Sequence, residues 1–169
     1  MKGAWTTVIV ESNASPIINL VAINQPNILR KLFNEIIISE VVYNEITVIS
    51  AGQLGSKEVR KLDWIKTQKV SNKALVKALK IDLDQGEAEA IALAAELNSD
   101  LLFIDEKMGR TVASRIDLKF VGLLVLLLEA KFKGIIQNIK PVLVDLRTKA
   151  GFWIRQQLYS RVLEFTNEN

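Results

Sequence analysis

Residues 84–105, DQGEAEAIALAAELNSDLLFID, carry the clearest structural signal in the chain. The first part of this stretch is rich in Ala, Glu and Leu, which have high helix propensity. Asp84 and Glu87 stand three positions apart just before the apolar residues, which is the spacing of a capping box. The run LLFI that follows indicates a short buried strand ending at Asp105. A helix followed by a buried strand predicts an α/β fold.

The same alternation of strands and helices extends in both directions from this stretch. Strands are predicted at 6–12 (TTVIVES), 35–38, 100–104 and 119–121, and helices at 16–21, 26–33, 40–46, 73–79, 84–97, 107–115, 123–131, 141–149 and 153–164. Residues 48–56 are predicted to form a loop, and 57–69 receive no assignment, although Trp64 and Ile65 are expected to be buried. Ser15 and Ser39 are expected to cap helices. The pattern predicts a mainly parallel sheet with helices on both faces.

The length of 169 residues favours one domain. We expect a core domain at 1–134 and a helical extension at 135–169 that packs on it. The chain contains no Cys and no His, which excludes thiol catalysis, Ser-His-Asp triads and the usual zinc sites. The net charge of +3 permits a polyanionic partner without requiring one. No signal peptide or membrane-spanning stretch is recognisable, which favours a cytoplasmic protein with no membrane partner.

Oxygen-bearing side chains stand where an α/β fold brings them together. Asn13 and Asp105 each follow a predicted strand, while Glu45 and Glu87 lie on the intervening helices. Open α/β folds place their sites at the carboxyl ends of parallel strands. Without His or Cys, such a group of side chains suits a hard divalent cation. The sequence therefore predicts a Mg²⁺ or Mn²⁺ site at this edge, in which Asn13 is a neutral amide.

Each of these residues also has a purely structural interpretation. Glu87 completes the capping box with Asp84, and Asp105 can cap the next helix. Glu45 can face solvent, and Asn13 can be a turn residue. Each of these alternatives is the more frequent outcome for a single residue, so the hypothesis rests on the four positions taken together.

Four segments resemble the PIN-domain superfamily: VESNASPIINL (10–20), VVYNEI (41–46), GEAEAIALAA (86–95) and DLLFIDEKMGR (100–110). They are most similar to the bacterial and archaeal PIN-like branch once described as a domain of unknown function. The resemblance continues through Gly122 and AKFKGII (130–136) and covers most of the chain.

This resemblance implies a Rossmann-like three-layer α/β/α sandwich. It places the acidic positions of the family on Asn13, Glu45, Glu87 and Asp105, with Glu89 and Glu106 as auxiliary ligands of one or two Mg²⁺ or Mn²⁺ ions. PIN proteins are typically metal-dependent ribonucleases, and many are toxins neutralised by a small antitoxin. The chain departs from the pattern at Asn13, where an acid is usual, and after Gly122, where Leu-Leu-Val replaces the usual Thr-x-Gly.

The leading hypothesis is a ribonuclease that cleaves single-stranded RNA, with Glu45, Glu87 and Asp105 as catalytic residues. Ser15, Lys107 and Arg110 are expected to contact the substrate, and Arg115 lies on the same predicted helix. For the basic residues, an ordinary exposed helix face is an equally good interpretation. A PIN scaffold that no longer cleaves and acts as a binding or dimerisation module is the alternative. A phosphoacceptor domain ranks third, because its acid pair should follow the first strand. A homodimer is expected from the family.

Overall fold

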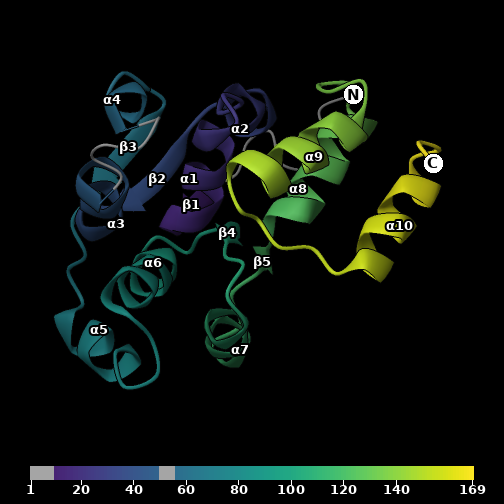
Figure 1. The fold of residues 1–169 in the computed structure, drawn as a ribbon. Coiled ribbons are helices and arrows are strands. Elements are labelled where there is room, and N and C mark those ends of the chain that lie inside the picture. The colour runs from purple at the N-terminus through teal and green to yellow at the C-terminus, as the bar shows by residue number, and fades with distance from the viewer. Residues whose placement is uncertain (1–9, 50–55) are drawn as a thin grey trace.

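The computed structural model describes residues 10–49 and 56–169 (Figure 1). A parallel sheet lies at its centre and has the strand order β3-β2-β1-β4-β5. The strands are β1 (Val10–Ser12), β2 (Ile36–Ser39), β3 (Ile65–Gln68), β4 (Leu101–Phe103) and β5 (Phe120–Val121). Because all of the pairs are parallel, the carboxyl ends of these strands meet at one edge of the sheet.

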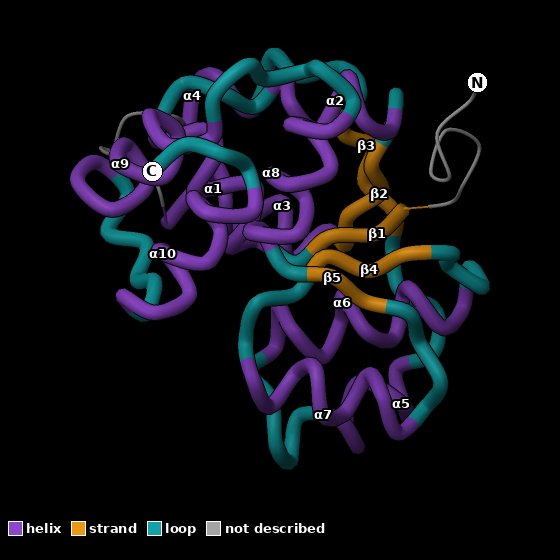
Figure 2. The backbone as a smooth tube through the Cα atoms, turned by 90° about the vertical axis from the view of Figure 1, so that its right-hand side faces the viewer, coloured by secondary structure: helices purple, strands orange, loops and turns teal. Residues whose placement is uncertain are grey.

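The helices are α1 (Ala14–Ala22), α2 (Asn27–Phe33), α3 (Glu40–Asn44), the π-helical turn η1 (Glu45–Ile49), α4 (Ser56–Val59), α5 (Lys73–Leu79), α6 (Gln85–Glu96), α7 (Lys107–Arg115), α8 (Leu123–Phe132), α9 (Ile139–Lys149) and α10 (Gln156–Phe165). Figure 2 shows α5, α6 and α7 on one side of the sheet and α1, α3 and α8 on the other. The structure is therefore the α/β/α sandwich that the sequence predicts.

The strand order places a topological switch point between β1 and β4. The chain runs outward from β1 to β2 and β3, then crosses back over β1 through α5 and α6 to reach β4 and β5. Right-handed crossovers in opposite directions put their helices on opposite faces of the sheet. The crevice at such a switch point, outside the carboxyl ends of the strands, is the usual ligand site of open α/β folds.

Local sequence signals account for several of these elements. The Asp84–Glu87 capping box begins α6 as predicted: Glu87 N–H donates to Asp84 Oδ1 at 2.8 Å, and Asp84 N–H donates to Glu87 Oε2 at 3.3 Å. Ser39 caps α3, with its hydroxyl accepting from Val42 N–H at 3.0 Å. Helices α5 and α7 have the predicted bounds.

Other expectations are wrong in detail. Ser15 does not cap α1, because β1 ends at Ser12, Asn13 N–H donates to Phe103 O at 3.0 Å, and the helix begins at Ala14. Asp105 does not cap α7, whose preceding residue is Glu106. Strand β3 lies in the segment left unassigned, although its first residue, Ile65, and the preceding Trp64 are buried as expected. Residues 6–9 of the first predicted strand, and 50–55 of the predicted loop, lie outside the described residues.

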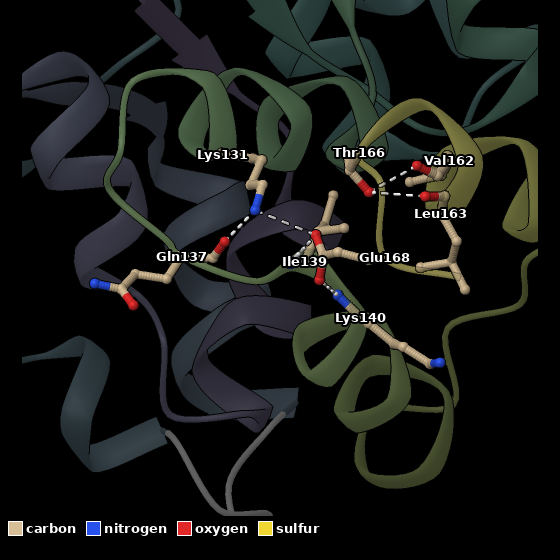
Figure 3. A network of polar contacts seen from close by, with 8 residues as sticks. All are labelled: Lys131, Gln137, Ile139, Lys140, Val162, Leu163, Thr166 and Glu168. Atoms are coloured by element: carbon tan, nitrogen blue, oxygen red, sulfur yellow. Dashed lines mark hydrogen bonds and ion pairs between the residues drawn. The ribbon is translucent and has the colours of Figure 1, made fainter.

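The C-terminal segment is tied to the helices before it by one carboxylate (Figure 3). Glu168 accepts hydrogen bonds from Ile139 N–H at 2.9 Å and Lys140 N–H at 3.0 Å, and its Oε2 lies 3.4 Å from Lys131 Nζ. These amides are free donors at the first turn of α9. Glu168 therefore joins the chain end to α8 and α9, and the division at residue 134 stays a prediction.

Helices in the described part of the chain are all too short or too polar to cross a membrane.

Candidate functional site

A pocket of about 330 Å³ opens at the carboxyl edge of the sheet, beside the switch point. It is lined by Asn13, Ala14, Ser15, Ile18, Glu45, Asp84, Glu87 and Glu106. We call it the acidic pocket, because all of its ionisable residues are carboxylates. They come from η1, from the start of α6 and from the residue that precedes α7, three segments that are separate in the sequence. The sheet topology alone brings them together.

Asn13 stands directly after β1 and before α1, and it is buried. Its side chain makes no capping hydrogen bond to α1, so the amide is not used to begin that helix. The backbone is instead fixed by the bond from Asn13 N–H to Phe103 O on β4. The side chain therefore lines the pocket from the centre of the sheet edge, where the sequence predicts a ligand.

Glu45 begins the π-helical turn that follows α3. Single π-helical turns are frequent at functional sites because they re-aim the side chains they carry. The Glu45 carboxylate lies against Gly86 so closely that a Cβ there would overlap with it. Burial raises the pKa of Glu45, and the charges of Asp84, Glu87 and Glu89 raise it further.

Glu87 lies on the first turn of α6 and is buried. Burial raises its pKa, and the charge of Asp84 adds to this effect. The hydrogen bond from Asp84 N–H opposes the shift, while the charge of Glu106 reinforces it. The capping interpretation of Glu87 is correct, and the same carboxylate also lines the acidic pocket, so its role as a site residue stays a prediction.

Asp105 lies apart from the acidic pocket. Its Oδ1 accepts from Leu123 N–H at 3.0 Å and from Arg110 Nη2 at 3.2 Å, which ties the end of β4 to α7 and α8. Its Oδ2 is buried and has no hydrogen-bond partner within the part of the chain that the structure describes. Burial raises the pKa of Asp105, while the Leu123 amide and the Arg110 guanidinium oppose the rise. Its role as a ligand stays a prediction.

The other predicted residues divide between three places. Glu106 and Ser15 line the acidic pocket, whereas Glu89 lines a separate, lysine-rich groove on the other side of α6. Lys107, Arg110 and Arg115 line a third hollow together with Asp105. Arg110 is held there, because its Nε also donates to Ile104 O at 3.1 Å. Glu87 and Glu89, two residues apart on α6, therefore line different hollows, and Glu87 is the one that lines the acidic pocket.

Sequence reasoning missed two contributors to this pocket. Asp84 lines it in addition to capping α6, and Gly86 provides the space that the Glu45 carboxylate occupies. The capping box was the available signal for Asp84, because a residue that begins α6 must lie beside Glu87. No local pattern indicates that Gly86 faces Glu45, since η1 and α6 meet only in the folded chain.

The oxygen atoms that line the acidic pocket are of the kind that bind a hard divalent cation, but the carboxylates do not form a complete coordination site. Carboxylate and amide oxygens are the ligands that Mg²⁺ prefers, and a cation would relieve the repulsion that raises the pKa values of Glu45 and Glu87. Among residues 10–49 and 56–169, however, no three acidic side chains are grouped closely enough to hold an ion. Mg²⁺ keeps several waters and is often held by one or two carboxylates, so the residues fit an ion with few protein ligands.

The fold and the site together describe an α/β domain of Rossmann-like type with an acidic pocket at the switch point of its sheet. A family model described as a PIN domain matches residues 9–168, and the chain belongs to the PIN-domain family. The family suggests a nuclease fold with a nucleic-acid partner, and PIN domains generally bind divalent metals. No curated protein matches the chain.

Proposed function

We propose that this protein is a PIN-type, metal-dependent ribonuclease that hydrolyses phosphodiester bonds of single-stranded RNA. One observation carries the proposal: Glu45 and Glu87, from segments far apart in the chain, line one pocket with Asn13 at the switch point of the sheet. Both carboxyl groups have raised pKa values from burial and from neighbouring negative charge. Such costly groupings of charge are concentrated at functional sites.

Glu45 and Glu87 would hold one or two Mg²⁺ or Mn²⁺ ions, with the Asn13 amide oxygen as a neutral ligand. Glu106, Glu89 and Asp105 would contribute through the outer shell. The bound metal would polarise a phosphate oxygen and make water a stronger nucleophile. The protein would orient the scissile phosphate, because Ser15 lines the pocket and Lys107 stands just beyond Glu106.

The direct test is cleavage of a labelled single-stranded RNA in Mn²⁺, with a chelator control. Wild-type protein should cleave in Mn²⁺ and not in chelator, and Glu45→Gln should lose at least about a hundredfold in kcat. Glu164→Gln, an exposed change on α10, is the matched control and should retain wild-type activity. Equal cleavage by wild type and Glu45→Gln would remove the acidic pocket from the mechanism.

A second candidate function is a PIN scaffold that binds nucleic acid or protein without cleaving. Two observations favour it: Asn13 is neutral, and Asp105 is bound to Arg110 and to the Leu123 amide. Replacing one carboxylate by an amide removes about 4 kcal/mol of attraction to a unit charge at 4 Å with an effective dielectric of about 20. Calorimetric titration with Mn²⁺ separates the two, because a disabled site would bind only after Asn13→Asp.

A toxin role with a small antitoxin, a homodimer and a cytoplasmic location complete the proposal. Exposed apolar side chains support a protein partner: Phe132 and Phe165 make an edge-to-face contact at 5.4 Å between centroids, and both are exposed. Light scattering of the purified protein tests the dimer. Co-expression with the product of a short neighbouring gene tests the antitoxin, which should restore growth if the protein is toxic.

A further inference from the structure

A second hollow, of about 460 Å³, lies next to the acidic pocket at the same edge of the sheet. It is bounded by the start of α3, the chain after β3, helix α5 and the first turns of α6. Its lining residues are Glu40, Val41, Lys69, Val70, Lys73, Val76, Lys77, Lys80, Gln85 and Glu89. We call it the lysine groove. Lys73 and Lys77 on α5 and Lys80 directly after it are spaced at i, i+4 and i+7, so they lie along one face of this helix.

The charge of this groove is not neutralised by the protein. Within residues 10–49 and 56–169, its lysines are exposed and none of the four makes an ion pair. Two glutamates share the lining: Glu40 is exposed at the rim, and Glu89 is close enough to Glu45 to raise its pKa. The groove therefore keeps an excess of positive charge that favours an anionic occupant.

The position of the groove relative to the acidic pocket indicates what the occupant is. The groove lies over the carboxyl ends of β3 and β2, and the acidic pocket lies over those of β1 and β4. A phosphate chain entering the acidic pocket would be repelled by its carboxylates. Cationic side chains in the groove offset this repulsion. The groove and the acidic pocket are roughly 14 Å apart or less, because β3 and β4 are three strand spacings apart in the sheet.

We propose that the lysine groove binds the phosphate backbone of single-stranded RNA and leads it into the acidic pocket. This inference rests on the proposed function, because it names the path of the substrate of that site. Lys107 and Arg115 beyond the acidic pocket would receive the chain on the other side. Among the described residues that line the groove there is no aromatic side chain on which a base could stack, so the expected contacts are those of lysines with phosphates, which carry no sequence information.

The test measures binding of a fluorescein-labelled single-stranded RNA in chelator, where no cleavage occurs, at several salt concentrations. Lys73→Gln, Lys77→Gln and Lys80→Gln are combined in one variant, and Lys31→Gln, Lys61→Gln and Lys119→Gln in a matched control. All six lysines are exposed, and both variants lower the net charge by the same amount. The control lysines precede β2, β3 and β5 and so lie toward the amino edge of the sheet.

Each phosphate contact on a single strand contributes about 0.7 to the slope of log affinity against log salt. The groove variant should therefore lose about two units of slope and at least about tenfold in affinity, while the control keeps the wild-type slope. Oligo(U) and oligo(A) should bind within a few fold of each other. In cleavage assays the groove variant should raise KM and leave kcat unchanged.

Equal slopes for wild type and the groove variant, or equal losses in both variants, would overturn the inference. So would an acidic peptide, poly-Glu, that binds through the groove while the RNA does not, because the occupant would then be a protein. Failure of the nuclease proposal looks different: the RNA binds through the groove with the expected slope but stays intact in Mn²⁺.

Discussion

Carboxylates lie at helix N-termini in two regions of this molecule, and their pKa values shift in opposite directions. At the C-terminal end, Glu168 accepts from two free amides of α9 and pairs with Lys131. Burial would raise its pKa, but the amides of Lys140 and Ile139 and the Lys131 charge outweigh burial and lower it. In the acidic pocket, Glu45 and Glu87 face other carboxylates, and their pKa values are raised.

The ionised carboxylate of Glu168 stabilises the folded state, whereas the ionised carboxylates of Glu45 and Glu87 destabilise it. The charge of Glu168 is compensated by the amides of Ile139 and Lys140 and by Lys131, so it needs no bound ligand. The pocket carboxylates have raised pKa values, so their ionisation lowers stability as long as no cation is bound. We therefore expect substitutions in the two regions to change different properties, catalysis in the acidic pocket and stability at Glu168.

The largest expected effect is that of Glu87→Gln on catalysis. Gln keeps the size of the side chain and its capping oxygen but removes the charge beside Asp84, so kcat should fall by at least about a hundredfold. Stability should be unchanged or higher at pH 7, because an uncompensated charge has been removed. Cleavage assays and urea unfolding measure the two properties. An unchanged kcat in the folded variant would assign Glu87 to capping alone.

Glu168→Ala should show the reverse pattern. It removes two charge-assisted hydrogen bonds and the partner of Lys131, so the free energy of unfolding should fall by about 1–3 kcal/mol. The Mn²⁺-dependent kcat should remain at the wild-type value, because Glu168 lies on the α8–α9 side of the molecule (Figure 3). Chemical denaturation and the cleavage assay check this pair of outcomes. A matching fall in kcat would contradict the separation of the two regions.

The pH dependence of stability should differ in sign between the two regions. Glu168 has a lowered pKa, so its contribution is present above the ordinary value of 4.5 and is lost as the pH falls below it. Glu45 and Glu87 have raised pKa values, so the protein loses stability as the pH rises from 4.5 through those values. Glu45→Gln/Glu87→Gln should thus exceed wild type in stability above this window and match it below. Urea unfolding between pH 4 and pH 8, without divalent metal, tests the sign.

Mn²⁺ should stabilise the wild-type protein and do so less for Glu45→Gln. A ligand that binds only the folded state adds about 2.7 kcal/mol at a hundred times its Kd. Asn13→Asp should enlarge the shift in Tm, while lowering Tm in chelator because a fifth carboxylate is added to the four that line the pocket. Thermal unfolding with and without Mn²⁺ measures all three proteins. No shift in any of them would argue against a metal at this pocket.

The smallest expected effect on the fold is that of Gly86→Ala. A Cβ at this position overlaps with the Glu45 carboxylate, which is the flexible end of its side chain and can move aside. Replacing a helical Gly by Ala favours α6 by about 0.5–1 kcal/mol, so stability should be retained. Activity should nevertheless fall severalfold because Glu45 is displaced. Equal kcat in the two proteins would show that the position of Glu45 is not critical.

The sequence by itself determined most of the helices and strands. The capping box at Asp84, the cap at Ser39 and the bounds of α5 and α7 follow from local chemistry, which acts within a few residues. Strand β3 was missed because its residues after Ile65 are exposed and lack an apolar pattern. The family motifs, read as a resemblance, pointed to the PIN fold that the family model identifies.

Tertiary structure alone decided which side chains share a pocket. Glu45 and Glu87 meet because the chain reverses its direction across the sheet between β3 and β4, and Asp105 turns aside because Arg110 and the Leu123 amide hold it. The lysines of α5 have a helical spacing that is visible in the sequence, but their place beside the acidic pocket depends on the strand order. Local interactions specify helices and caps, whereas proximity between distant residues depends on how the whole chain packs.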